Sequence, residues 1–151
     1  MVYNKSQTGW AIIFIFTLVI IHIFLSYTFE WGNSPLTLKY FLLLTGLFTI
    51  VILLFYKLTV EINGTVLKLT YGIGLIKFSY KIDKLEEIEV VKNPWYYGFG
   101  IRITPKGMLY NIQGLKAIRL CFTNGGKKKC IMVGTSEPKL LKKALKENFT
   151  S

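Results

Sequence analysis

Two long apolar runs without a charged residue constrain this chain more than any other feature of its sequence. The first extends over Trp10–Thr28 and the second over Tyr40–Tyr56. A helix needs roughly 20 apolar residues to cross a hydrocarbon core of about 30 Å. The first run has that length, and the second reaches it once Leu36–Leu38 are added and Lys39 extends its ammonium group to the interface. The runs therefore predict a transmembrane helical hairpin.

The residues that flank the two runs favour the same interpretation. A short polar link, Glu30–Pro35, joins them. Aromatic residues of the kind found at membrane interfaces stand at the ends of the runs: Trp10, Tyr27, Trp31, Tyr40 and Tyr56. A cleaved signal peptide would need a basic N-terminal region and a cleavage site of small residues, which Tyr27–Trp31 does not provide. We expect spans at about residues 10–28 and 37–56.

The division of charge predicts the orientation of the chain in the membrane. Residues 1–57 form the predicted hairpin region, and residues 58–151 are enough for one small domain. Seventeen of the 19 basic and seven of the eight acidic residues lie from Lys57 onward, a net charge of +10. Basic segments stay in the cytoplasm, so both termini are expected there. For a domain held at the membrane, anionic lipid is a nearer partner than nucleic acid, and we expect no nucleic-acid binding.

Beyond Tyr56 the pattern changes to the alternation of apolar and polar residues that is typical of β-strands. Asn63-Gly64 is a strong signal for a tight hairpin, and counting across it pairs Val60 with Leu67 and Leu58 with Leu69. Further strands are predicted over residues 76–82, 85–92, 99–104, 108–113, 117–123 and 128–133. Within residues 85–92, Ile88 and Val90 are expected to point inward. Residues 1–9 read as a short polar leader with no motif.

The C-terminal segment has the pattern of an amphipathic helix. Pro138 suits a first helical turn, and one apolar stripe follows it: Leu140, Leu141, Ala144 and Leu145. Lysines fill the opposite face, as expected for a helix with one face exposed to water. The stripe is predicted to cover an open end or edge of the sheet.

The two cysteines are predicted to lie opposite each other in a second hairpin. With Gly125-Gly126 as its two-residue loop, Cys121 faces Cys130 at a pair of positions whose side chains approach closely. A cross-strand disulfide is one outcome of this placement. The predicted cytoplasmic location favours two reduced thiols instead.

No arrangement of residues in the sequence indicates catalysis. The single histidine, His22, lies in the first apolar run. We interpret it as a neutral side chain that is either hydrogen-bonded to the other helix or near the outer end of its own. The pairs Gly72-x-Gly74 and Gly98-x-Gly100 lack the remainder of a dinucleotide-binding motif, and no metal-ligand cluster is present. We therefore expect a protein that is not an enzyme and that uses no cofactor or metal.

Three groups of residues resemble a known family. They are Tyr71-Gly72-x-Gly74, the aromatic and glycine-rich block Pro94–Asn111, and Gly134-Thr135 with Pro138 and Leu141. Together they resemble the bacterial pleckstrin-homology-like (PH-like) membrane proteins, which carry two transmembrane helices before the domain. The resemblance implies a bacterial cell membrane location and a mainly-β barrel or sandwich of about seven to eight antiparallel strands with a C-terminal capping helix. Because the first hairpin loop is short and uncharged, inositol phosphate binding is not carried over.

Two surface segments are candidates for contacts with other molecules. Alternation cannot bury all of Trp95, Tyr96 and Tyr97 on one face of a sheet, so they either cover the end of a barrel or reach toward the membrane or a partner. Arg102 and Tyr110 are expected on the same surface. The candidate lipid contact is the basic hairpin tip formed by Lys127, Lys128 and Lys129, whose charges otherwise remain solvated.

The functional hypothesis is a membrane-anchored, non-enzymatic PH-like module at the inner leaflet that binds a protein partner or forms a homo-oligomer. One alternative is a module that binds anionic lipid through its basic face. Another is an accessory subunit of a membrane complex in which the surface around His22 is covered. The domain from about Leu58 onward is expected to fold without the hairpin.

Overall fold

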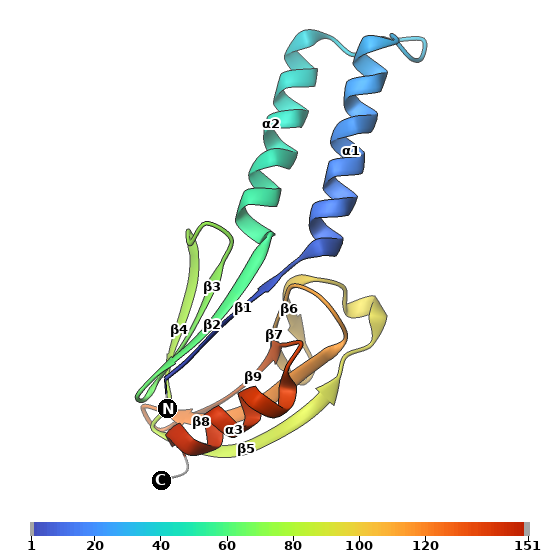
Figure 1. Ribbon diagram of the computed structural model, residues 1–151. Coiled ribbons are helices and arrows are strands. Elements are labelled where there is room, and N and C mark those ends of the chain that lie inside the picture. The colour runs from blue at the N-terminus through green and yellow to red at the C-terminus, as the bar shows by residue number, and fades with distance from the viewer. Residues whose placement is uncertain (1, 150–151) are drawn as a thin grey trace.

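Two long helices stand on a β-rich domain in the computed structural model, which describes residues 2–149 (Figure 1). In chain order the elements are β1 (Tyr3–Thr8), α1 (Trp10–Thr28), α2 (Leu38–Phe55), β2 (Lys57–Asn63), β3 (Val66–Tyr71), β4 (Ile76–Lys81), β5 (Lys84–Lys92), the 3₁₀ turn η1 (Trp95–Tyr97), β6 (Gly100–Thr104), β7 (Gly107–Asn111), β8 (Lys116–Asn124), β9 (Lys127–Gly134) and α3 (Pro138–Phe149).

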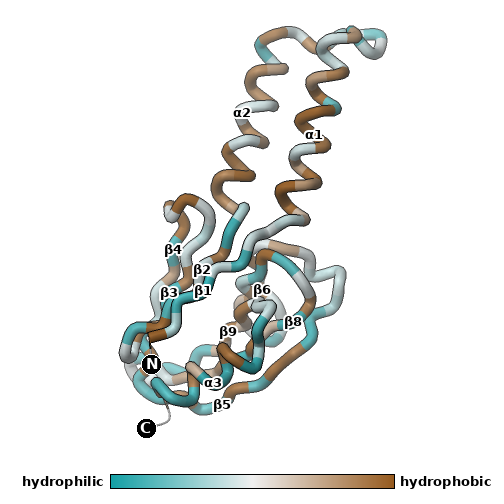
Figure 2. Tube along the Cα trace, in the orientation of Figure 1, coloured by the Kyte–Doolittle hydropathy of each residue, from teal (hydrophilic) through white to brown (hydrophobic). Residues whose placement is uncertain are grey.

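Helices α1 and α2 form the predicted hairpin. They contain 19 and 18 residues, and both are long and apolar enough to cross a membrane. Their apolar side chains remain mostly exposed, which distinguishes them from the core helices of a water-soluble protein. Figure 2 shows that apolar residues predominate along both helices. The two helices contact each other through ring pairs such as Tyr27 and Phe41, whose centroids lie 4.5 Å apart.

Sheet A contains four antiparallel strands in the order β1-β2-β3-β4. Strand β1 lies within residues 1–9, so the interpretation of this segment as a polar leader is wrong. Tyr3 lies opposite Ile62 and is buried. The strand escapes sequence analysis because its other residues are polar and its partner lies beyond both helices. The predicted division at residue 57 therefore separates β1 from the sheet to which it belongs.

The first hairpin of sheet A forms with a register that differs from the predicted one. Asn63 pairs with Val66, so Gly64 and Thr65 occupy the turn, and Val60 lies opposite Leu69 rather than Leu67. The shift is two residues. Because side chains alternate with a period of two, an even shift leaves every apolar side chain on its predicted face.

Sheet B contains five strands in the order β5-β8-β9-β7-β6. Strands β7 and β9 run parallel, with Met108 opposite Ile131, while the other pairs are antiparallel. The expectation of about seven to eight antiparallel strands is therefore wrong in two respects: residues 2–149 form nine strands, and one pair of them is parallel. The two sheets do not close into a barrel. Alternation within a strand identifies its apolar face but does not show which other strand pairs with it.

One hydrophobic core joins the two sheets and the C-terminal helix. It includes Leu58 and Leu69 from sheet A, Ile118 and Leu120 from sheet B, and Leu141 and Leu145 from α3. Helix α3 packs on β5 and β8, which confirms that its apolar stripe covers the sheet.

Two further expectations about sheet B are corrected by the structure. The pairing of β5 with β8 is irregular between Leu85 and Glu87, which interrupts the alternation, and Val90 is exposed rather than inward. Cys121 and Cys130 lie opposite each other as predicted, and their sulfurs form a disulfide rather than two free thiols. The register of the hairpin brings the two sulfurs within bonding reach.

Candidate functional site at the base of the helices

The two helices of the hairpin are direct continuations of two neighbouring strands. Strand β1 continues into α1 through Gly9, and α2 continues into β2 through Tyr56 (Figure 1). The Gly9 N–H donates to the Tyr56 carbonyl oxygen at 2.7 Å, which joins the two connections. The helices are thus held at the domain by the same ladder that pairs β1 with β2.

The turn between β3 and β4 supports the end of α2. The last carbonyl groups of a helix have no partner within the helix. Here the Ile73 N–H donates to the Leu53 carbonyl oxygen at 3.1 Å. The neighbouring Gly72 N–H donates at 2.7 Å to the carbonyl oxygen of Lys57, the first residue of β2. Ile73 and Leu75 are strongly exposed at this turn. An apolar turn therefore lies beside the last turn of α2 (Figure 1).

The start of α1 is capped by a residue of the loop between β7 and β8. The Gln113 side-chain oxygen Oε1 accepts from the Trp10 N–H at 2.9 Å, and the Gln113 carbonyl accepts from Gln7 Nε2 at 2.9 Å. This glutamine lies 103 residues from Trp10 in the sequence. Sequence analysis missed its role because no local pattern marks a cap that comes from so far away.

A cleft of about 500 Å³ lies where the helices meet the domain. Its walls are Ile12, Ile15 and Phe16 of α1, Val51 and Phe55 of α2, and residues 99–102 at the start of β6. The volume falls within the range of small-molecule sites. All but one of the side chains that line it are apolar.

Arg102 is the charged residue of the cleft. Its side chain packs beside Gly98, since a Cβ built on that glycine would lie 3.3 Å from the guanidinium nitrogen Nη2. Arg102 is exposed and forms no ion pair with another residue between positions 2 and 149. A positive charge is thus available at the edge of an apolar cavity.

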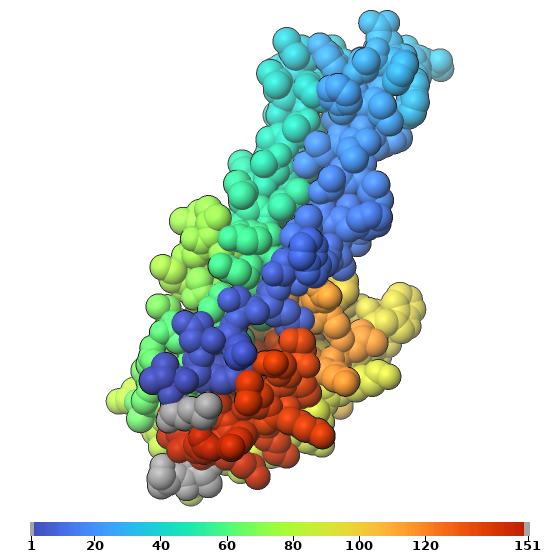
Figure 3. Space-filling model, in the orientation of Figure 1, coloured from blue at the N-terminus to red at the C-terminus, as the bar shows by residue number. Residues whose placement is uncertain are grey.

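The aromatic segment Trp95–Tyr97 immediately precedes this strand. Trp95 is 81% exposed and Tyr96 is 65% exposed, which confirms that alternation cannot bury all three rings. Tyr97 packs instead against a small cluster that includes Leu109 and Met132. The yellow segment that contains η1 projects from the side of the domain (Figure 3).

Tyr110 does not lie on the surface expected for it. It is 1% exposed, and its hydroxyl is hydrogen-bonded to that of Tyr80. Burial is the main reason that the pKa of Tyr110 lies above its ordinary value. The expectation that Tyr110 lines one surface with Arg102 is wrong, because Tyr110 points into the core between the sheets.

The basic tip Lys127–Lys129 lies at the end of the domain remote from the helices. Hydrogen bonds connect this end to the turn between β2 and β3: Ile82 N–H donates to Thr65 O at 2.8 Å, and Asp83 N–H donates to Thr123 O at 3.0 Å. Lys128 pairs with Glu86 at 2.9 Å. Hydrogen bonds from Thr123 and Lys128 hold the pKa of the Glu86 carboxyl below its ordinary value.

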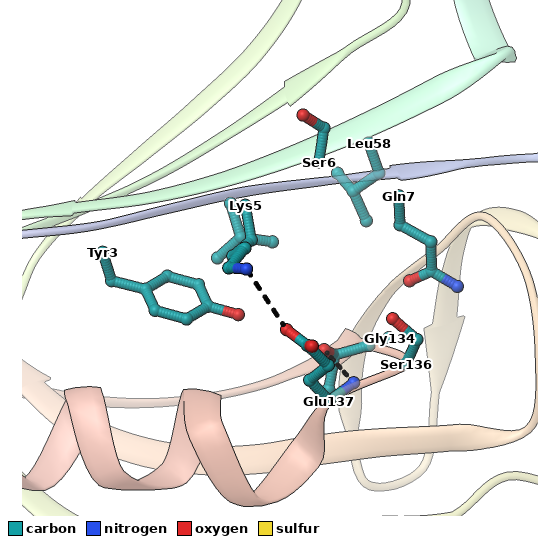
Figure 4. A pocket seen from close by; sticks show the side chains of 10 residues that line it. Tyr3, Lys5, Ser6, Gln7, Leu58, Gly134, Ser136 and Glu137 are labelled. Carbon is teal, nitrogen blue, oxygen red and sulfur yellow. Dashed lines mark hydrogen bonds and ion pairs between the residues drawn. The ribbon is translucent and has the colours of Figure 1, made fainter.

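A small polar pocket of about 190 Å³ separates β1 from the start of α3 (Figure 4). Lys5 Nζ lies 3.8 Å from Glu137 Oε2 across it, and both side chains are about half exposed. Burial, then the charge of Glu137, raise the pKa of Tyr3 beside this pair. An exposed pair of this kind contributes little stability.

His22 lies near the outer end of α1, with its ring 5.7 Å from the ring of Trp31. Within residues 2–149, no three histidine, cysteine or acidic side chains are grouped so that they could hold a metal ion. The contact of His22 is therefore with the link between the helices and not with a polar cluster.

Comparisons of the chain with protein families, with curated proteins and with solved structures find no match. The features that remain for a functional argument are the two exposed apolar helices, the cleft at their base and the aromatic segment beside it. All three are observed in the structure of this chain itself.

Proposed function

We propose that the protein is a membrane-anchored, non-enzymatic module that presents the aromatic segment Trp95–Tyr97 to a protein partner or to a second copy of the chain. The observation that carries the proposal is the exposure of Trp95 and Tyr96 outside the apolar helices. Tryptophan and tyrosine supply most of the binding energy in many protein interfaces. Helices α1 and α2 would keep this surface at the membrane.

We further infer a distant likeness to PH-like domains. It is supported by the two sheets that share one core and by the helix α3 at the C-terminus. The parallel pairing of β7 with β9 departs from the all-antiparallel arrangement that the resemblance implies. The proposed likeness therefore concerns the order and arrangement of the elements, and we infer no ligand from it.

The domain is placed on the cytoplasmic side in this proposal. Its support is the concentration of basic residues from Lys57 onward. The disulfide between Cys121 and Cys130 favours the opposite side, because disulfides persist in oxidising compartments.

The alternative of lipid binding through the basic tip has less support. Lys127–Lys129 lie away from the helices, and Lys128 is already paired with Glu86. A solvated charge cluster at that distance from the bilayer is screened by physiological salt. An accessory role in a larger membrane complex is one form of the partner hypothesis and shares its test.

Site-specific photo-crosslinking in native membranes tests the proposal. A benzophenone side chain in place of Tyr96 in the full-length chain should give a discrete adduct, either with a second copy or with one other protein. The same side chain in place of Lys128, which is also exposed, is the matched control and should give none. Equal adducts at both positions, or none at position 96, would contradict the proposal.

The Trp95→Ala variant links the adduct to the aromatic surface. With benzophenone at position 96, this substitution should remove most of the adduct, because interface tryptophans contribute about 2 kcal/mol or more. Changing Lys127 and Lys129 to Gln should leave the adduct in place. Circular dichroism of each purified variant confirms that its fold is retained.

A further inference from the structure

We propose that the cleft at the base of the helices binds one anionic phospholipid, with an acyl chain against α1 and α2 and the phosphate beside Arg102. The inference rests on the membrane anchoring in the proposed function but needs no protein partner. It also differs from the lipid hypothesis based on the sequence, because the lysines of the basic tip take no part in it.

The walls of the cleft suit an acyl chain. Ile12 and Phe16 come from the first two turns of α1, and Val51 and Phe55 come from the last two turns of α2. If these helices span the bilayer, this side of the cleft is continuous with their lipid-facing surface. A lipid can then enter sideways from the leaflet without passing through water, and its acyl chain exchanges contacts with other lipid tails for contacts with equally apolar side chains.

The opposite wall supplies the charge for the headgroup. The guanidinium of Arg102 presents several N–H donors that match phosphate oxygens. No acidic side chain of residues 2–149 is ion-paired with it, so it remains available. Basic pockets between transmembrane helices are known to hold anionic headgroups.

The direction of α1 also favours an anionic headgroup in the cleft. The helix begins at Trp10 beside the cleft and has no acidic residue in its first turn. The N-terminal end of a helix carries a partial positive charge that favours anions. A free phosphate would satisfy Arg102 but would leave the apolar walls empty, which is why the occupant is assigned as a membrane phospholipid.

Photoactivatable lipids in nanodiscs test the assignment with the full-length chain. Phosphatidylglycerol and phosphatidylcholine that carry the same diazirine acyl chain are each added as a trace to phosphatidylcholine nanodiscs. Labelling by phosphatidylglycerol should exceed labelling by phosphatidylcholine about fivefold, the factor that one basic residue near a lipid headgroup supplies. The labelled peptides should include residues 12–16.

Two variants that each remove one positive charge distinguish the site at Arg102 from a general attraction of anionic lipid to basic residues. Arg102→Gln should reduce labelling by phosphatidylglycerol to the level of phosphatidylcholine. Lys106→Gln removes an exposed charge from the neighbouring turn and should leave the preference intact. Ile15→Trp fills the cleft and should reduce labelling by both lipids.

The outcomes separate this inference from the proposed function. Equal labelling by the two lipids, or equal effects of Arg102→Gln and Lys106→Gln, would overturn the phospholipid site while leaving the partner hypothesis standing. Failure of the chain to remain in membranes after alkaline carbonate extraction would overturn both. Circular dichroism of Arg102→Gln establishes that any loss of labelling comes from a folded protein.

Discussion

Gly72 connects the β-domain to the helical hairpin. Its φ is +52°, a conformation that glycine adopts without steric cost. A Cβ at this position would collide with the backbone of Leu53 and Leu54 at the end of α2. Both the conformation and the close approach therefore require glycine. Gly64 has nearly the same φ, +55°, but no atom lies within 4 Å of its Cβ direction.

Comparing Gly72→Ala with Gly64→Ala isolates the contact with the helix. Gly64→Ala should lower the free energy of unfolding by about 1 kcal/mol, from the backbone conformation alone. Gly72→Ala should lower it by roughly 2 to 4 kcal/mol, because the collision with α2 adds to that cost. Denaturant unfolding of the full-length chain in detergent gives both values. Equal losses would show that the turn does not support α2.

Two buried tyrosines connect stability to alkaline pH. Burial raises the pKa of Tyr71 and of Tyr110 above the usual value for tyrosine. The unfolded chain therefore releases these protons first, near pH 10. Their contribution to stability is fully present below that pH and is lost as the pH rises above it, because the folded state then holds more protons than the unfolded state.

Tyr71→Phe should weaken this dependence on pH. The variant keeps the ring in the core and removes one titrating group, so the free energy of unfolding should fall less steeply above about pH 10, by up to about 1.4 kcal/mol per pH unit. Denaturant unfolding at a series of pH values, with tyrosinate absorbance recorded in parallel, measures both slopes. Identical slopes for the variant and the wild type would contradict the assignment.

At the scale of elements, strand β1 makes the N-terminus part of the domain. It pairs along its whole length with β2, and Tyr3 reaches the core. A fragment that begins at Leu58 lacks this strand and exposes the edge of β2. Such edges invite pairing between chains. The expectation that residues 58–151 fold alone thus omits an element that the structure contains.

Replacing the helices by a turn tests the role of β1. Gly9 and Tyr56 are hydrogen-bonded, so a short glycine-containing loop can replace residues 10–55. This shortened chain should be a monomeric, cooperatively unfolding β-rich protein, whereas the fragment from Leu58 should be less stable and should associate. Circular dichroism and sedimentation velocity compare the two. Equal stability and equal monomer content would show that β1 is dispensable.

At the scale of the whole molecule, charge and redox chemistry suggest different sides of the membrane. The basic residues favour the cytoplasm, whereas the disulfide between Cys121 and Cys130 favours an oxidising compartment. The domain cannot occupy both. Its position also determines which leaflet meets the cleft.

Fusions at the C-terminus decide the orientation. Green fluorescent protein placed after Ser151 should be fluorescent, and alkaline phosphatase at the same position should be inactive, because basic segments resist translocation. An active phosphatase together with a non-fluorescent fusion would place the domain outside the cytoplasm.

The sequence by itself determined the features that depend on local periodicity. Run length and the absence of charge predicted the two apolar helices, and alternation predicted most of the strands. The stripe that contains Leu141 and Leu145 predicted a helix that covers the sheet. The two-residue loop Gly125-Gly126 predicted that Cys121 would lie opposite Cys130. Each of these depends on residues close together in the chain, which a periodic pattern reports directly.

Only the tertiary structure decided which elements meet. It supplied β1, the parallel pairing of β7 with β9, the burial of Tyr110 and the cleft beside Arg102. The physical reason is that a periodic pattern identifies the apolar face of an element but not the element that covers it. Partners such as β1 and β2, or Trp10 and Gln113, are separated by tens of residues, and their contacts exist only once the chain has folded.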